Sequence, residues 1–240
     1  MNHKRILLKL SGEALSSNSS ILDRNILNGI LNQVKILINE YGLEIGIVVG
    51  GGNIFRGQIS QSIGLGEDTA PADYMGMLAT TINAIGLNSF FNKNGVESKL
   101  QNSLKIENVS SGINVKAANK FLSEKKVVIF GGGTGKPYLS TDTAAAMRAI
   151  EIKADAILMA KNGVDGVYDD DPLKNANAQF IPELSFQDVI KNKLRVVDLE
   201  AMELLKNQKI DLILFNMNTP NNIISLYKNK YTKKTIIKEK

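Results

Sequence analysis

The sequence has no cysteine and no tryptophan, and its 240 residues include a single histidine. Without cysteine, a disulfide framework, a thiol nucleophile and a cysteine-bound metal are all excluded. The histidine, His3, stands beside the start of the sequence, where we expect a frayed segment rather than an active site. Any chemistry must therefore use lysine, arginine, carboxylates, hydroxyls, backbone amides or a metal ion.

Aromatic residues make up only 6% of the sequence, and long apolar runs are missing. A base-stacking platform for single-stranded nucleic acid is not expected from so few rings. No run approaches the roughly 18 apolar residues that a membrane helix needs, and residues 1–10 lack a cleavage signal. The chain is 43% hydrophobic and 22% charged, as is usual for globular proteins. We expect one cytoplasmic domain over residues 1–240, without membrane or nucleic-acid partners.

Positive charge is concentrated at the end of the sequence. The net charge is +5. Six lysines lie in the last thirteen residues: Lys228, Lys230, Lys233, Lys234, Lys238 and Lys240. We interpret them as a solvated basic tail rather than a nucleic-acid-binding arm, although residues from Tyr231 onward can add a hairpin.

Apolar runs with strand and helix periodicity alternate along the chain. We expect strands at residues 5–10, 44–49, 96–100, 127–130, 156–160 and 211–215. Helices are expected at residues 21–41, 72–92 and 115–123, and in a segment that Thr141 or Asp142 caps and that runs through Ile152. This alternation predicts an α/β fold, a three-layer αβα sandwich around a mostly parallel sheet. In such sheets ligands bind beyond the carboxyl ends of the strands.

Two glycine-rich turns each follow an apolar strand. The first is Gly50-Gly51-Gly52, and the second runs from Gly131 to Gly135. Glycine lets a backbone approach an anion closely and point several N–H groups at it, so the pair indicates phosphate binding. Neither turn is a Walker P-loop, because Pro137 stands where serine or threonine would bind magnesium.

Five charged residues are candidates for the chemistry beside these turns. Lys9 and Lys161 each close a strand, where an ammonium can neutralise charge on transferring phosphates, although most lysines are solvated. Asp142 either caps a helix or fixes a lysine. Arg56 can clamp phosphate, and Asp73 can accept hydrogen bonds from ribose hydroxyls. With no histidine base available, an acceptor that is already anionic is favoured: a phosphate monoester or a carboxylate.

The combination of motifs resembles bacterial uridylate kinases of the amino-acid kinase superfamily. The matching segments are KLSGEAL (9–15), VVGGGNIFRG (48–57), ADYMGMLAT (72–80), GTGKPYLSTDTAA (133–145), VDGVYDDDP (164–172) and FNMN (215–218). The resemblance implies Mg²⁺-dependent transfer of the ATP γ-phosphate to UMP in pyrimidine nucleotide biosynthesis, giving UDP and ADP. It also implies a homohexamer, with the UMP site mainly in the N-terminal part and the ATP site mainly in the C-terminal part.

The resemblance also implies roles for individual residues. Those matching ATP contacts are Lys9, Leu10, Ser11, Gly12, Gly52, Arg56, Asn162, Tyr168 and Asp171. Those matching UMP contacts are Gly51, Asp73, Thr134, Gly135, Lys136, Pro137, Tyr138, Leu139, Ser140 and Thr141. Lys9, Lys161, Asp142 and Arg56 would serve the reaction centre, with Asp198 as a supporting charge. No side-chain metal site is implied, since Mg²⁺ would be held through the nucleotide phosphates.

Two departures from the family pattern affect what is expected. The segment after Leu15 is short, so the GTP activation associated with that region is not expected here, whereas UTP feedback inhibition is implied. Lys136 stands where relatives often carry asparagine, which can alter how UMP is held. Two alternatives remain open: a superfamily kinase that phosphorylates a carboxylate or carbamate, and a non-catalytic uridine-nucleotide sensor. Selectivity for UMP over CMP or dUMP is not predicted.

Overall fold

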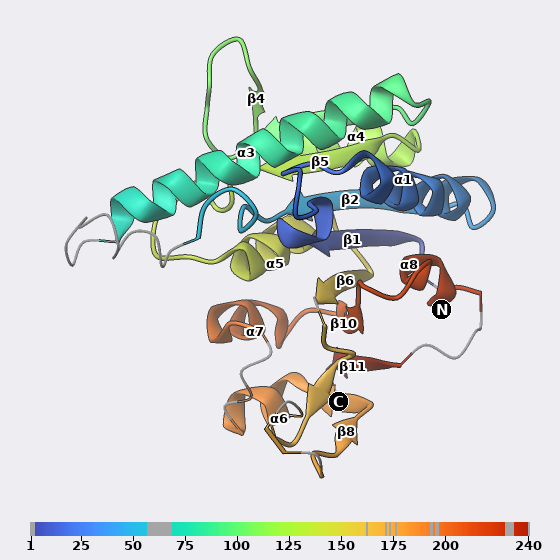
Figure 1. Ribbon diagram of the computed structural model, residues 1–240, viewed down its shortest axis with the longest axis vertical. Helices are drawn as coiled ribbons and strands as arrows, with labels where there is room; N and C mark the ends of the chain where they lie inside the picture. The colour runs from blue at the N-terminus through green and yellow to red at the C-terminus, as the bar shows by residue number, and fades with distance from the viewer. Residues whose placement is uncertain are drawn as a thin grey trace.

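The computed structural model describes residues 3–56, 69–161, 163–170, 172, 174–175, 177–192, 194, 197–228 and 233–239. Its centre is a nine-stranded sheet with helices on both faces (Figure 1). The strands lie across the sheet in the order β4 (Ser111–Gly112), β3 (Ser98–Asn102), β5 (Val127–Gly131), β2 (Glu44–Val49), β1 (Arg5–Leu10), β6 (Ala156–Lys161), β10 (Asp211–Asn216), β11 (Lys234–Lys238), β9 (Glu183–Ser185). A separate hairpin pairs β7 (Val167–Tyr168) with β8 (Phe180–Ile181).

Alternation of side chains along the strands divides the core into two halves. The first half contains buried residues of α1 (Arg24–Asn39), α3 (Ala70–Lys93) and α8 (Asn222–Ser225). The second contains those of α4 (Val115–Ser123), α5 (Thr141–Glu151), α6 (Phe186–Lys191) and α7 (Leu199–Leu205). Neighbouring residues of β1 illustrate the division, since Ile6 and Leu8 belong to the first half and Leu7 to the second. The expected three-layer αβα architecture is confirmed.

Strand direction places six strand ends at one edge of the sheet. From β3 to β10 every neighbouring pair is parallel, so these strands end on the same side, at Asn102, Gly131, Val49, Leu10, Lys161 and Asn216. β1 lies between β2 and β6, and the chain leaves β1 towards β2 on one side and later returns to β6 on the other. Ligand sites in open α/β sheets form at such a change of direction.

Three expectations about local structure need correction. Ser140, rather than Thr141 or Asp142, caps α5, because its side chain accepts a hydrogen bond from the Thr143 N–H. The strand expected at residues 96–100 is Ser98–Asn102. The lysine-rich end is no solvated tail over its described part: β11 pairs antiparallel with β10 and parallel with β9. None of the described helices is both long and apolar enough to span a bilayer.

Candidate active site at the carboxyl edge of the sheet

The end of β1 and the first glycine turn form one packed unit. The Gly50 N–H donates to the Leu10 carbonyl at 2.8 Å. A Cβ atom on Gly12 would lie 2.6 Å from the Gly52 nitrogen and 2.8 Å from that of Asn53, closer than side chains pack. The short helix η1 (Glu13–Leu15) follows Gly12, and the Ser11 carbonyl accepts the Ala14 N–H. Glycine is therefore required where the two turns touch.

A single carboxylate holds two lysines at this edge. The Lys9 Nζ lies 2.7 Å from Asp142 Oδ1, and the Lys161 Nζ lies 3.4 Å from Asp142 Oδ2. Lys9 is the penultimate residue of β1 and Lys161 ends the neighbouring β6, while Asp142 lies in the first turn of α5. Lys9 is only 9% exposed. The three side chains together carry one net positive charge, partly shielded from water.

The ionisation of these groups follows from their burial and their proximity. Burial opposes the charged form of Asp142, but the adjacent Lys9 and Lys161 outweigh it and lower the pKa of this carboxyl below its ordinary value. For Lys161, burial lowers the pKa of the ammonium, while Asp142 acts in the opposite direction. Asp142 thus stays ionised at neutral pH and helps to keep Lys161 protonated.

Arg56 lies at the rim of the first glycine turn. Its guanidinium contacts Glu13 Oε1 at 3.1 Å, and its Nε donates to the Gly52 carbonyl at 3.2 Å. The side chain is 62% exposed. Arg56 is therefore brought to the turn that carries Gly52, but it makes no ion pair with Asp142.

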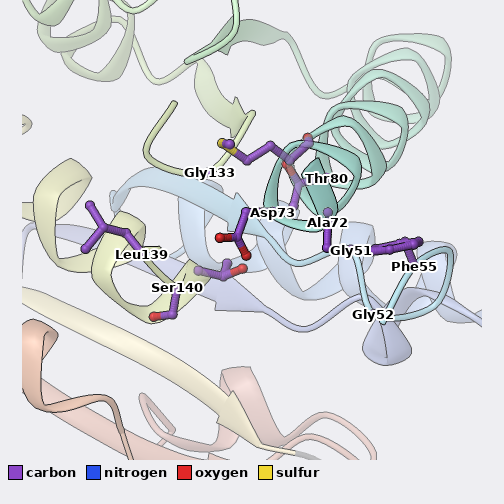
Figure 2. A pocket seen from close by; sticks show the side chains of 12 residues that line it. Gly51, Gly52, Phe55, Ala72, Asp73, Thr80, Gly133, Leu139 and Ser140 are labelled. Atoms are coloured by element: carbon purple, nitrogen blue, oxygen red, sulfur yellow. The ribbon is translucent and has the colours of Figure 1, made fainter. Parts of the chain in front are cut away.

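An open cavity of about 220 Å³ lies between the first glycine turn, the start of α3 and the segment before α5 (Figure 2). Among its lining residues are five of those expected at the UMP site: Gly51, Asp73, Leu139, Ser140 and Thr141. In Figure 2 the Asp73 carboxylate lies between α3 and the segment with Leu139 and Ser140. Thr141 lines the cavity, and the next residue in the chain is Asp142, the carboxylate that pairs with both lysines.

Residues 134–138 connect Gly133 to Leu139, two residues that line the cavity. The Tyr138 N–H donates to Asp73 Oδ2 at 2.8 Å, which joins this loop to the first turn of α3. The Thr134 hydroxyl bonds the carbonyl and the N–H of Lys136 at 2.9 and 3.1 Å, respectively. Gly135 adopts a φ of +79°, a conformation that favours glycine. Thr134, Gly135, Lys136, Pro137 and Tyr138 do not themselves line the cavity described above.

Two polar residues of α3 that were not singled out from the sequence hold both glycine turns. Asn83 is fully buried, and its Nδ2 donates to the Gly50 carbonyl at 2.8 Å and to Asn53 Oδ1 at 2.7 Å. Thr80 Oγ1 accepts the Gly132 N–H at 2.8 Å. The signal in the sequence that could have pointed to them is a polar residue on the apolar side of the expected helix.

Two further expected residues, Tyr168 and Asp198, do not line the cavity. Tyr168 is on β7, where its ring meets that of Phe180 edge-on at 5.4 Å. Asp198 is the residue before α7, and its charge favours the protonated form of Lys161. Asn162 and Asp171 lie outside the described residues. Within the described part of the chain, no group of three or more acidic or histidine side chains is placed to hold a metal ion.

Comparisons with known proteins identify the family of the chain. The model of the Amino acid kinase family matches residues 4–216. A uridylate kinase of Mycoplasma capricolum subsp. capricolum is 46% identical over 95% of each chain. The crystal structure of UMP kinase from Ureaplasma parvum has a TM-score of 0.92 and 38% identity, with full coverage of both chains. The UMP kinase of Bacillus anthracis also gives a TM-score of 0.92, at 33% identity over 100% of this chain and 97% of its own. The chain belongs to the amino acid kinase family, and within that family it is similar to the uridylate kinases.

Proposed function

We propose that the chain is a UMP kinase, a nucleoside monophosphate kinase that transfers the γ-phosphoryl group of ATP to UMP and yields UDP and ADP. The observation that carries the proposal is a cavity lined by Asp73 and by Thr141, the residue that precedes Asp142 of the Lys9–Asp142–Lys161 cluster. The cavity is suited to an acceptor with a ribose and an anionic end. The uridylate kinase relatives support the same substrate.

The charges at the edge of the sheet are suited to transfer without a proton acceptor. The UMP phosphate is largely doubly ionised near neutral pH, because the second pKa of phosphate monoesters is about 6. It can therefore attack the terminal phosphorus of ATP directly, and the protein has only to position both groups and neutralise charge. Lys9 and Lys161 would do so from fixed strand ends, and the glycine N–H groups would bind phosphate oxygens.

Mg²⁺ bound to ATP would supply further neutralisation of the phosphates. Both oxygens of Asp142 are already paired with lysines. Mg²⁺ in kinases usually keeps several waters and binds through substrate phosphates. This donor set fits a metal that arrives with the nucleotide.

We assign the two nucleotides to two parts of one domain, residues 1–240. UMP would lie in the cavity, with Gly51, Asp73 and residues 134–141 around it. ATP would lie along residues 9–12, Gly52 and Arg56 towards Tyr168, with Asn162 and Asp171 as further contacts. The enzyme would act in cytoplasmic pyrimidine nucleotide synthesis, with UTP as a feedback inhibitor.

Asp73 provides a test of the UMP position. In the Asp73→Asn variant the amide oxygen can still accept the Tyr138 N–H, so the loop should stay in place. We expect the KM for UMP to rise about tenfold, the scale for losing a charge-assisted hydrogen bond, with kcat and the KM for ATP nearly unchanged. Steady-state kinetics with each substrate varied will measure this. An unchanged KM for UMP would limit Asp73 to holding Tyr138.

An acceptor panel tests the reaction itself. With ATP and Mg²⁺, we expect ADP release with UMP to exceed that with glutamate, aspartate or carbamate at least about 100-fold, because those acceptors leave the ribose contacts unmade. CMP and dUMP in the same panel measure base and sugar selectivity. ADP release with a carboxylate but not with UMP would identify the alternative kinase. Uridine-nucleotide binding without turnover would identify a sensor.

We further propose that the enzyme is a homohexamer in which α3 contributes to contacts between copies. Five apolar side chains of α3 are between 37% and 49% exposed: Tyr74, Met75, Leu78, Ile82 and Ile85. Tyr74, Leu78, Ile82 and Ile85 recur at helical spacing, which makes a continuous apolar stripe. Contiguous apolar surface of this kind commonly marks a protein–protein contact.

A further inference from the structure

The lysine-rich end of the chain is part of the sheet rather than a free extension. β11 lies between β10 and β9, and Thr235 and Ile237 are fully buried there. Lys238, in the same strand, faces outward and pairs with Glu183 at 3.0 Å. The segment therefore has one fully buried inner face, with Thr235 and Ile237, and one partly buried face, on which Ile236 packs against the core and Lys238 makes a surface ion pair.

The inner face of β11 holds the β7–β8 hairpin. Thr235 Oγ1 accepts the Val167 N–H at 2.9 Å and donates to the Ile181 carbonyl at 2.6 Å, so a single hydroxyl bonds both strands of the hairpin. A Cβ atom on Gly166 would lie 3.0 Å from the Thr235 nitrogen, which shows how closely the two segments pack. The position of the hairpin is thus set by the C-terminal strand.

Lys233, the residue before β11, fixes the aromatic side chains of that hairpin. Its Nζ donates to the Tyr168 hydroxyl at 2.8 Å and lies 5.1 Å from the centre of the Tyr168 ring. The same ammonium lies 4.8 Å from the centre of the Phe180 ring and 3.6 Å from Asp165 Oδ2. The hydrogen bond with Tyr168, more than the nearby Asp165, raises the pKa of Lys233. The tyrosine ring is held by its edge contact with Phe180 and by this ammonium.

The cluster around Lys233 is connected to the reaction centre. Asp165 accepts a hydrogen bond from Asn216 Nδ2 at 3.2 Å. Asn216 ends β10 directly opposite Lys161 of β6, and the next residue, Met217, donates its N–H to the Lys161 carbonyl at 2.8 Å. Tyr168 and Lys161 are therefore joined by short contacts through strand ends. A nucleotide with its phosphates near Lys161 can extend its nucleoside towards Tyr168.

We infer that Lys233 is a positioning residue of the ATP site and acts by holding the Tyr168 ring in the orientation that receives the nucleoside of ATP. This inference rests on the proposed function, in which Tyr168 contacts ATP. A cation held over an aromatic ring and bonded to its hydroxyl restricts the ring more than either contact alone. The lysine-rich segment thereby gains a role in binding the phosphoryl donor rather than a nucleic acid.

The Lys233→Met variant tests the inference, because methionine keeps the unbranched apolar chain and removes the ammonium. We expect the Kd for ATP–Mg²⁺, measured by calorimetry on the full chain without UMP, to rise roughly three- to tenfold. The KM for ATP should rise with it, while the KM for UMP and kcat stay within about twofold. Lys233→Arg should restore most of the affinity. Lys238→Met, in the same strand but outside the cluster, should bind ATP like wild type.

A double variant separates positioning from direct contact. If Lys233 acts through Tyr168, Lys233→Met combined with Tyr168→Phe should weaken ATP binding no more than the stronger single variant. The inference would be overturned if the fold-increase in Kd for ATP in the double variant equalled the product of the two single increases, or if Lys233→Met bound ATP like wild type. A wild-type chain that fails to bind ATP at all would instead contradict the proposed function, and this binding measurement does not depend on the acceptor.

Discussion

Replacing Lys9 by methionine is expected to lower turnover at least ~100-fold, the scale for losing one preorganised charge-stabilising group. Lys9 is buried at the end of β1 and contacts the carboxylate of Asp142, so its ammonium is held in place before substrate binds. Methionine preserves the apolar part of the side chain. Asp142 keeps Lys161 as a partner at 3.4 Å, and the variant should therefore remain folded.

The loss should fall mainly on kcat, because charge on the transferring group develops in the transition state. Coupled measurement of ADP release at saturating ATP and UMP gives the turnover number, and a melting curve confirms folding. Lys4→Met is a matched control, since Lys4 is exposed at the opposite end of the same strand. A folded Lys9→Met variant with near wild-type kcat would remove Lys9 from the reaction centre.

Replacing Asp142 by asparagine is expected to lower the free energy of unfolding by about 3–5 kcal/mol at neutral pH, as when one partner of a buried ion pair is removed. Two ammonium groups, Lys9 and Lys161, would then lie close together without a counter-charge. For a chain of this size the loss corresponds to a fall in melting temperature of roughly 6–20 °C. Activity should fall too, since both lysines lose their fixed partner.

The stability difference between wild type and Asp142→Asn should depend on pH in one direction. Lys9 and Lys161 overcome the effect of burial and hold the pKa of Asp142 below its ordinary value of 3.8. The stabilisation by this carboxylate is therefore fully present above that value and is lost as the pH falls through the lowered pKa of the folded state. The two melting curves should be furthest apart near neutral pH and should converge in acid.

Glu97→Gln is a suitable control for this experiment. Glu97 also pairs with lysines, Lys99 and Lys126, but on the exposed surface, where ion pairs contribute little to stability. We expect no comparable change in its melting temperature. If the Asp142→Asn variant melted within roughly 2 °C of wild type at pH 7, the stability of the folded chain would not depend on the pairing of Asp142 with the two lysines.

The strands β1, β2, β5 and β6 could be predicted because each is a short apolar run that ends at or next to a cluster with glycine or lysine. The glycine turns and the lysines at strand ends follow from the same pattern. The sequence left two roles open for Asp142, a helix cap or the partner of a lysine. Lys9 is distant from it in sequence, and a carboxylate at the start of a helix is as often a cap. In the folded chain Ser140 provides the cap, and Asp142 is available for the lysines.

The full pairing of the C-terminal strand and the inner side of α3 could not be predicted, for different reasons. The hairpin expected from Tyr231 onward is borne out by the antiparallel pairing of β10 with β11. The burial of Thr235 and Ile237 was missed because the lysines on both sides of this short run indicate a solvated segment. In α3 apolar residues cover both the inner side and the outer stripe, so the helix has no clear polar face against which Asn83 and Thr80 would stand out. Tertiary packing, rather than local pattern, decides which polar groups are buried.

The attachment of both glycine turns to α3 has a mechanical consequence. Asn83 holds one turn and Thr80 the other, within a single turn of the same helix. A continuous α-helix bends little over so short a length, so the two anchor points keep a constant separation while surrounding loops fluctuate. If the glycine turns bind phosphates as proposed, the helix would act as a rigid spacer between them that neither nucleotide needs to assemble upon arrival.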